Sequence, residues 1–337
     1  MKTRSSFGYS LIELMVALTI GLVLLLGVGT VFVTSRATYE VSETQARMVD
    51  DGRFVMQLLG DDLRMAGTWG QNSFTTMVDN RTRGSFDRQP LLAAIDGDCD
   101  DNWYTDLDQV VFATNGSADP PNDNPFSATC VPASASWLEN TDMLIVRYAS
   151  PTPVADEFVS PGVVYVRSAP GNSVLFVGTN DPNDVPSEPT NGQNHVLQTA
   201  LYYVSDFTET AGDGLPSLHR ITLGPGPALT DEMIAPGVEN FQVQVGFDSE
   251  QPLPDGKSNM YINADSNEIN WNDPADLARV RSVRVWVLLR SETVQKAVSS
   301  PGTYEMAGET VAPEGNYKRL LLSGVFDVRN FQQMGIQ

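Results

Sequence analysis

The sequence predicts an α+β protein in which one long N-terminal α-helix packs on a mainly antiparallel β-sheet head with long loops. Three features lead to this fold class: an apolar run near the N-terminus, a helical stripe of apolar residues behind it, and short β-type runs separated by turn-rich segments over the rest of the chain. A chain of 337 residues can hold one large β-rich domain or two smaller domains, and both arrangements stay open.

The first element is an apolar run from Leu11 to Val33, interrupted only by Glu13 and two threonines. At about 1.5 Å per residue, a helix of this length crosses the roughly 30 Å hydrocarbon core of a bilayer. Lys2 and Arg4 precede the run, and several acidic residues follow it. Because loops rich in Lys and Arg stay on the cytoplasmic side, we expect a single-pass helix with a cytoplasmic N-terminus and everything after about Ser35 outside.

Two simpler interpretations of this run explain less. A cleaved secretory signal has an apolar region of about 7–15 residues that ends at a small-residue cleavage site. The observed run is longer, and Gly27-Val28-Gly29 imitates such a site only weakly. A plain signal anchor leaves Glu13 unexplained, since a carboxylate costs about 2.5–3.5 kcal/mol at the centre of a membrane helix and less near the interface. This charge therefore invites a functional explanation.

The helix is expected to continue beyond the membrane and to run from Tyr9 to Ala66. An apolar stripe with helical spacing supports this, and its members are Met48, Val55, Leu59, Leu63 and Ala66. Gly67 then supplies a stop, because glycine fits the left-handed conformation past a helix end. The first half of such a helix must lie in lipid or among similar helices, whereas the second half has one apolar face for a globular head.

The head, residues 67–337, contains nine runs that predict an antiparallel sheet. They are Gln109–Ala113, Met143–Tyr148, Val163–Arg167, Val174–Gly178, Ala200–Val204, Leu218–Leu223, Phe241–Phe247, Val280–Leu289 and Lys318–Val328. In the run that starts at Phe241, apolar residues alternate with Gln242, Gln244 and Gly246, which predicts one buried face and one wet face.

Three long polar segments separate these runs: Asn115 to Ser136, Asp181 to Asn194 and Asp248 to Asp276. Loops of this length in a compact domain tend to be functional or mobile, so we expect them to form contact surfaces. A proline cluster, Pro151, Pro153 and Pro161, could divide the head into two lobes.

The residues Phe7-Gly8-Tyr9-Ser10-Leu11-Ile12-Glu13-Leu14 resemble the prepilin motif of type IV pilins and type II secretion pseudopilins. The resemblance implies a pilin-like fold and a leader, residues 1–8, that a prepilin peptidase removes after Gly8. It also implies methylation of the new N-terminal amine at Tyr9, although the family usually has phenylalanine there. Glu13 matches a family glutamate that is thought to attract the N-terminal amine of an adjacent subunit, which implies a role in subunit docking.

Two further regions resemble the PilW-type minor pilins. One is the segment Met65-Ala66-Gly67-Thr68-Trp69-Gly70 that follows the helix. The other runs from Ile234-Ala235-Pro236-Gly237-Val238-Glu239 through Trp271 to Arg290. The J-class pseudopilins of type II secretion share the general plan but are usually shorter.

Cys99 and Cys130 are the only cysteines. An even count in an exported protein suggests one disulfide, with two free thiols as the alternative.

The segment around Cys99 has the alternate carboxylates of a calcium loop, at Asp96, Asp98 and Asp100. It departs from the EF-hand pattern, because Asp101 stands where a glycine is required and Leu107 where the bidentate glutamate should be. A solvated acidic loop is the simpler interpretation, and a calcium site stays open. No cofactor is expected otherwise.

The net charge argues against nucleic-acid binding, and the motif content argues against catalysis. With 21 basic and 42 acidic residues, the net charge of -21 repels nucleic acid and anionic lipid. The sequence has no G-x-S-x-G elbow, no P-loop and no H-E-x-x-H. His195 and His219, the only histidines, have no metal-ligand spacing. We therefore do not expect an enzyme.

Three functions are compatible with these patterns. The first is a minor pilin near the tip of a type IV pilus that primes assembly and supports adhesion, twitching motility or DNA uptake. Its partners would be other minor pilins, the major pilin, the prepilin peptidase and an inner-membrane assembly platform, and it would pass from the inner membrane, with its head in the periplasm, to the cell surface. The second is a type II secretion pseudopilin. The third is a membrane-anchored binding protein, against which Gly8 and Glu13 argue.

Overall fold

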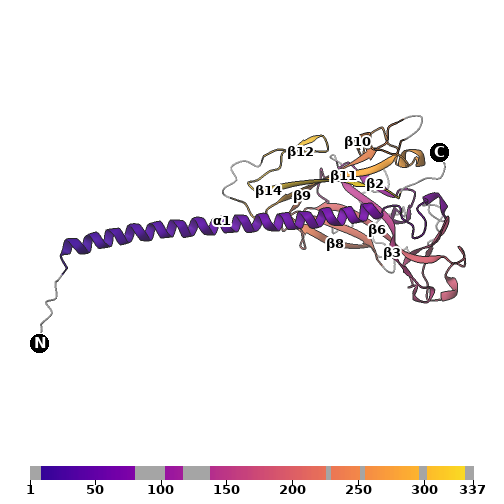
Figure 1. The fold of residues 1–337 in the computed structure, drawn as a ribbon, viewed down its shortest axis with the longest axis horizontal. Coiled ribbons are helices and arrows are strands. Elements are labelled where there is room, and N and C mark those ends of the chain that lie inside the picture. Colours follow the sequence, from indigo (N-terminus) through magenta and orange to yellow (C-terminus); the bar gives the residue numbers. More distant parts are fainter. Residues whose placement is uncertain are drawn as a thin grey trace. The chain divides into compact units, whose positions relative to one another are not determined.

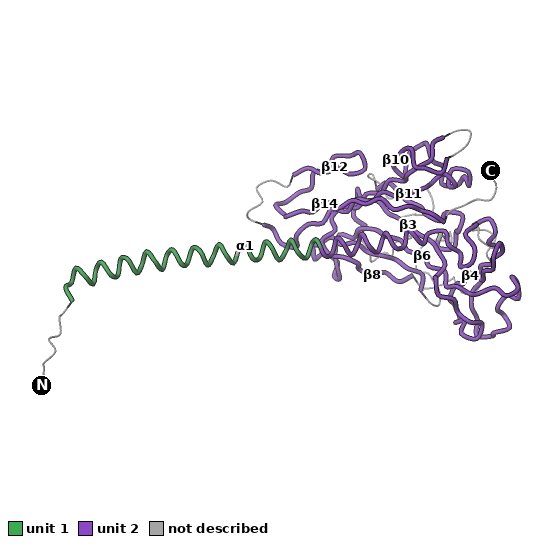
Figure 2. The backbone as a smooth tube through the Cα atoms, in the orientation of Figure 1, with its two compact units in different colours: residues 1–49 green, residues 50–337 purple. Residues whose placement is uncertain are grey.

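The computed structural model describes residues 9–79, 103–116, 137–224, 229–250, 255–295 and 302–330. The chain divides into two compact units, Met1–Val49 and Asp50–Gln337, which Figure 2 shows in green and purple. One helix, α1 (Leu11–Met65), begins in the first unit and ends in the second (Figure 1).

The first unit contains the apolar part of α1. Its large apolar side chains between Leu11 and Val33 are exposed by 51–78%, on every face of the helix. By length and composition this part is able to cross a membrane, with a mean hydropathy of 2.6 in its most apolar window and none of that window buried. The predicted helix that is apolar on all faces is confirmed.

In the second unit, the last four turns of α1 pack on the head. Val55, Leu59, Leu63 and Ala66 are completely buried, which confirms that the predicted stripe faces the core. The helix ends at Met65, and Gly67 follows with a left-handed φ of 77° while its N–H donates to the carbonyl of Arg147 at 3.0 Å. Glycine provides the helix stop that the sequence predicts.

Within the described residues, eight strands form the larger sheet, in the order β1-β5-β4-β6-β3-β2 with β7 beside β6 and β8 beside β7. All pairs are antiparallel except β1 with β5. The strands are β1 (Val78–Asp79), β2 (Val111–Thr114), β3 (Met143–Val154), β4 (Val164–Ala169), β5 (Asn172–Val177), β6 (Gln193–Ser205), β7 (Ser217–Leu223) and β8 (Leu229–Pro236).

A smaller antiparallel sheet has the order β10-β9-β11-β14, and two further strands pair as the hairpin β12–β13. These strands are β9 (Val238–Phe247), β10 (Met260–Asn263), β11 (Val280–Arg290), β12 (Tyr304–Met306), β13 (Glu309–Val311) and β14 (Arg319–Asp327). The short helices of the described part are η1 (Thr75–Met77), η2 (Trp103–Thr105), η3 (Asp156–Phe158), η4 (Pro182–Asp184) and α2 (Pro274–Leu277).

All nine predicted strands are present, and the structure adds strands without a strong sequence pattern. Strand β8 was missed because it lacks alternation and is mostly exposed. The prediction that Asp248 to Asp276 forms one long loop is wrong, because β10 lies inside it and pairs with β9.

The predicted wet face of β9 is also wrong. Gln242 is buried, and its Nε2 donates to the carbonyl of Asn140 at 2.9 Å. The Nε2 of Gln244 donates to the carbonyl of Ala307, in the turn of the β12–β13 hairpin, at 3.0 Å. Neighbouring segments therefore cover this face, and the glutamines satisfy the backbone carbonyls that come with them.

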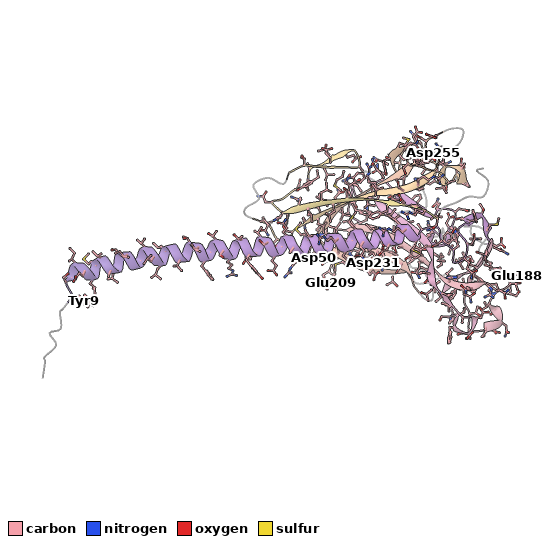
Figure 3. All side chains as sticks on the ribbon, in the orientation of Figure 1. Tyr9, Asp50, Glu188, Glu209, Asp231 and Asp255 are labelled. Atoms are coloured by element: carbon pink, nitrogen blue, oxygen red, sulfur yellow. The ribbon has the colours of Figure 1, made fainter. Side chains whose placement is uncertain are left out.

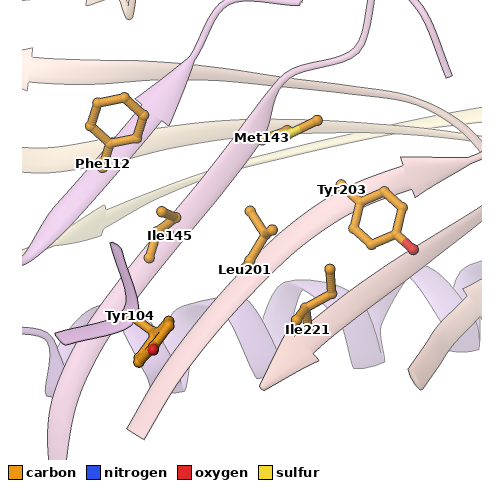
Figure 4. Close-up of a cluster of buried hydrophobic side chains, with 7 residues drawn as sticks. All are labelled: Tyr104, Phe112, Met143, Ile145, Leu201, Tyr203 and Ile221. Carbon is orange, nitrogen blue, oxygen red and sulfur yellow. The ribbon is translucent and has the colours of Figure 1, made fainter. Parts of the chain in front are cut away.

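The core of the larger sheet is a cluster of seven buried side chains, which Figure 4 shows on η2, β2, β3, β6 and β7: Tyr104, Phe112, Met143, Ile145, Leu201, Tyr203 and Ile221. A second cluster lies on the smaller sheet and contains Val245, Phe247, Ile262, Ile269 and Val280. Trp271 packs against both clusters, so this one side chain joins the cores of the two sheets.

Hydrogen bonds from the backbone to Asp142 and a close backbone crossing at Gly237 join the sheets as well. Asp142 lies just before β3, and its carboxylate accepts hydrogen bonds from the N–H of Gly116 at 2.9 Å and from the N–H of Val243, on β9, at 2.6 Å. Between β8 and β9 the chain changes sheet at Gly237, where φ is 78° and an added Cβ would lie 2.6 Å from the carbonyl oxygen of Arg290. Only glycine fits this crossing.

Candidate functional site

The start of α1 carries a reciprocal pair of hydrogen bonds between Ser10 and Glu13. The N–H of Ser10 donates to Oε2 of Glu13 at 2.9 Å, and the N–H of Glu13 donates to Oγ of Ser10 at 3.2 Å. This is a capping box, in which two side chains satisfy N–H groups that a helix N-terminus leaves unpaired. The S-x-x-E spacing was a readable signal for it. Glu13 therefore has a partner within its own chain, which sequence reasoning missed.

The other residues of the predicted processing site are only partly described. Tyr9 is 90% exposed at the start of the helix (Figure 3), while Gly8 lies outside the described residues. The predicted cleavage between them, the methylation of Tyr9 and the docking role of Glu13 stay predictions.

Two further sets of predicted residues also lie outside the described ranges: Cys99 and Cys130, and the acidic residues Asp96, Asp98 and Asp100. The disulfide and the calcium site stay predictions. In the described ranges, no group of three or more His, Cys, Asp or Glu side chains is arranged to hold a metal ion.

Where α1 meets the larger sheet, one buried carboxylate, Asp62, is held by two tyrosines. The hydroxyl of Tyr148, on β3, donates to Oδ1 of Asp62 at 2.8 Å, and the hydroxyl of Tyr202, on β6, donates to Oδ2. Burial raises the pKa of both tyrosines, and the Asp62 charge raises them further. Both hydroxyls therefore keep their protons and act as donors to the carboxylate.

Arg220, on β7, completes what we call the helix-anchoring cluster: Asp62, Tyr148, Tyr202, Arg220 and Glu232. Nη1 of Arg220 lies 3.9 Å from Oδ2 of Asp62, and its Nη2 lies 2.5 Å from Oε1 of Glu232, on β8. Hydrogen bonds depend on direction as well as distance. The cluster therefore fixes the rotation and the axial position of the last turns of α1 on the sheet, which apolar packing alone specifies less sharply.

On its other side, α1 approaches β14 closely through glycines. A Cβ added to Gly52 would lie 2.3 Å from Cδ1 of Leu322, and one added to Gly60 would lie 2.7 Å from Cε1 of Phe326. Glycine lowers helix propensity by about 1 kcal/mol relative to alanine. These two glycines therefore lower the local stability of the helix, and they allow the helix and the sheet to touch directly.

The segment Met65–Gly70, at the end of the helix, packs into the head, and we call it the plug. The Trp69 side chain is completely buried, and its Nε1 donates to Oγ1 of Thr75 at 3.1 Å. The N–H of Ala149, on β3, donates to the carbonyl of Thr68 at 2.7 Å. This segment therefore ties the end of α1 to β3.

His195 packs against that plug and is structural. It is 4% exposed, its Nδ1 lies 2.8 Å from the carbonyl oxygen of Ser150, and its Cδ2 would lie 2.5 Å from a Cβ on Gly70.

Around His219 the side chains have the order of a Ser-His-Asp triad. Nε2 of His219 lies 3.0 Å from Oγ of Ser217, and Nδ1 lies 3.1 Å from Oδ1 of Asp231, whose Oδ2 accepts from the hydroxyl of Tyr203 at 2.9 Å. However, Ser217 is completely buried, and its hydroxyl donates to the carbonyl of Phe207. This network ties β6, β7 and β8 together and does not present a nucleophile to solvent.

The second PilW-like segment also has a structural role. Glu239, at the start of β9, forms an ion pair with Arg319, whose side chain has no exposed area. Arg319 in turn donates to the carbonyl oxygens of Glu314 and Gly315. The pair thereby fixes the segment that leads into β14.

Two family models match this chain. Residues 201–330, from the middle of β6 to the end of β14, match the type IV pilus-assembly protein W (PilW) family, and residues 3–29 match the prokaryotic N-terminal methylation motif. No curated protein and no solved structure matches the chain.

The methylation motif matches the apolar start of α1, and the PilW match covers the predicted region from Ile234 to Arg290 but does not include the segment Met65–Gly70. Both point to a structural, membrane-anchored protein that works with other pilus components. Together the two matches support a type IV minor pilin of the PilW type.

Proposed function

We propose that this protein is processed by a prepilin peptidase and incorporated near the tip of a type IV pilus, where it primes filament assembly. The observation that supports this best is the combination of a methylation motif on an exposed apolar helix with a PilW-type head. Such a helix needs either lipid or other helices around it, so leaving the membrane requires neighbouring subunits. Adhesion, twitching motility or DNA uptake would follow from a working pilus.

Processing is the first step to test. The basic leader and the Gly8-Tyr9 junction support cleavage between these residues. Mass spectrometry of the purified protein should show a chain that starts at a methylated Tyr9. A mature chain that starts near Thr30 would mean an ordinary signal peptide and would overturn the proposal.

Docking is the second step. An unpaired carboxylate is costly in an apolar medium, and the N-terminal amine of a neighbour is a stronger partner for Glu13 than the Ser10 N–H, because it carries a full positive charge. We infer that Glu13 exchanges the Ser10 contact for that amine when the subunit enters the filament. Glu13→Gln isolates the charge, since glutamine also completes a capping box.

Glu13→Gln should leave export, cleavage and folding intact while lowering the amount of this protein in sheared pili. Ser10→Ala serves as the control, because it weakens the cap and keeps the charge. Equal incorporation of Glu13→Gln and the parent would show that the carboxylate does not drive docking.

The partners decide which filament the protein serves. A pull-down of the mature protein should recover the major pilin and other minor pilins. Recovery of secretion pseudopilins and exported proteins in their place would assign the protein to a type II secretion system.

A further inference from the structure

We infer that the outer edge of β14 is a docking site for a strand from the head of a neighbouring, different pilin-type subunit. This inference rests on the proposed assembly into a filament and adds to it the surface that makes the contact. Among the described residues β14 pairs only with β11, over nine residues and without a bulge. No strand of the described ranges pairs with its other side, which leaves a long open edge of the smaller sheet there.

The register shows which backbone groups are open. The N–H of Ser291 donates to the carbonyl of Lys318, and the N–H of Val328 donates to the carbonyl of Arg281. Hydrogen-bonded and non-hydrogen-bonded pairs alternate along an antiparallel ladder. The backbone groups directed away from β11 are therefore those of Arg319, Leu321, Ser323, Val325 and Asp327.

This edge lacks the protection that sheet edges usually carry, such as short length, charge or proline. The edge strands β1, β2 and β10 span only two to four residues each. The other long edge strand, β8, has Asp231 and Glu232 in its middle and ends at Pro236. Strand β14, in contrast, has no charge between Arg319 and Asp327, and Val325 is 48% exposed. An open, uncharged strand of this length is suited to accept another strand.

The direction of β14 points to the kind of partner. A Cβ on Gly52 or Gly60 would meet Leu322 or Phe326 respectively, and one on Gly324 would meet Met56, so β14 runs parallel to α1. Subunits anchored in one membrane with the same orientation have parallel helices. In an antiparallel ladder the partner strand runs opposite to β14 and therefore opposite to α1. Because the partner's helix is parallel to α1, this strand also runs opposite to the helix of the partner subunit. Antiparallel pairing with β14 of a second copy would instead reverse one of the two helices.

The border of this edge carries charges of both signs. Arg64, whose side chain is 58% exposed, lies over the Phe326 ring at 5.9 Å from its centroid. Arg53 is exposed three turns earlier on the same helix face, and Arg329 follows the end of β14 with its side chain 76% exposed. Arg64 lies 2.9 Å from Asp61 and Arg329 lies 3.4 Å from Asp327 of the same chain, so this border holds ion pairs, and the direction of β14 rather than net charge identifies the partner.

Site-specific photo-cross-linking in the full-length protein, expressed with the other pilus subunits, tests this inference. A photo-reactive phenylalanine at Val325 should cross-link to another pilin-type subunit, at a peptide from a sheet edge of its head. The same group at Thr230, which is exposed on β8, is the matched control and should give no such product. A product with a second copy, a product with this chain's own residues, or no product at Val325 would overturn the inference.

Ser323→Pro provides a second readout. It removes an N–H that faces the open edge and leaves the β11 ladder intact. The cross-linking yield should therefore fall roughly tenfold, because the loss of one intermolecular hydrogen bond weakens binding by about that factor. Ser323→Thr keeps the N–H and should match the parent, and equal thermal unfolding of both variants would show that the head still folds. If Ser323→Pro cross-links and enters sheared pili like the parent, the edge inference fails while the proposed function stands. Absence of the parent from sheared pili would overturn the proposed function itself.

Discussion

At the scale of single residues, the informative side chains are buried polar groups that the apolar pattern does not reveal. Asp62 lies within the last turns of α1, and its two tyrosine donors come from strands 86 and 140 residues away along the chain. Asp142 holds the N–H of Gly116, just after β2 of the larger sheet, and the N–H of Val243, on β9 of the smaller sheet. Each of these carboxylates joins parts of the head that would otherwise meet only through apolar contacts.

Removing the Asp62 carboxylate should destabilise the head strongly. Asp62→Ala leaves the hydroxyl of the buried Tyr202 without an acceptor, at about 1–3 kcal/mol, and that of the half-buried Tyr148 at a smaller cost, so we expect a loss of about 2–4 kcal/mol in the free energy of unfolding. Asp61→Asn is the matched control: its side chain is 61% exposed beside Asp62 in the sequence, and it should change stability by less than about 0.5 kcal/mol. Denaturant titrations of the detergent-solubilised protein measure both. Equal losses would contradict the role given to the cluster.

Asp142 should make stability depend on pH. Burial raises the pKa of Asp142 from 3.8 to about 7. Between these values the folded state keeps a proton that the unfolded state has lost, so this residue's contribution is fully present below about pH 4 and declines as the pH rises to about 7. The full effect is at most roughly 4 kcal/mol.

Asp142→Asn removes the titration and keeps a carbonyl acceptor. The stability of the variant relative to the parent should therefore rise between about pH 4 and pH 7. Because both proteins share the other titrating carboxylates, the contributions of those groups to the free energy of unfolding cancel in this difference. A difference that is flat over this range would contradict the raised pKa.

At the scale of elements, the contacts at the end of α1 determine how the helix joins the head. The helix stops at Gly67, the plug continues to Gly70, and His195 of β6 closes over it. The sequence indicates the stop, because a glycine after an apolar stripe is a local signal. The contact between Gly70 and His195 spans 125 positions and has no local signal.

Gly70→Ala tests this junction. Gly70 has a φ of 74° and an added Cβ would press on the imidazole, whereas Gly171 has a φ of 77° with open space around it. Alanine costs about 1–2 kcal/mol in the left-handed conformation at either site. Gly70→Ala should therefore lower the thermal stability more than Gly171→Ala, by about 1–3 kcal/mol of overpacking. Equal effects would mean that the imidazole moves aside without cost.

At the scale of the whole molecule, the two units differ in the polarity of their exposed side chains. The first unit exposes apolar side chains on all faces, and the second unit carries the two sheets and most of the acidic residues. The first unit is suited to lipid or to other helices, whereas the head is suited to water.

A disulfide between Cys99 and Cys130 is expected in the exported head. Closing a loop of about thirty residues stabilises a protein by about 3–4 kcal/mol in the chain-entropy model. Thiol labelling of the denatured, unreduced protein should find no free cysteine, and full labelling should appear after reduction. Two labelled cysteines per chain before reduction would refute the bridge.

The sequence by itself determined the features that depend on local patterns. The apolar run, the stripe that ends at Ala66, the nine strand runs and the prepilin motif are each read within a few turns or residues, because hydrophobic periodicity follows directly from helix and strand geometry. The capping box of Ser10 and Glu13 also has a local signal, a spacing of three, but only the structure revealed it.

Only the tertiary structure decided which surfaces are covered and which stay open. On β9, Gln242 is buried and Gln244 is half-buried, because the segment around Asn140 and the hairpin β12–β13 lie over them. Asp62 is paired because two distant strands bring tyrosines to it, and the edge of β14 is open because no described strand pairs with it. These outcomes depend on contacts between residues far apart in the sequence, and a local pattern does not encode which segment will arrive at a given face.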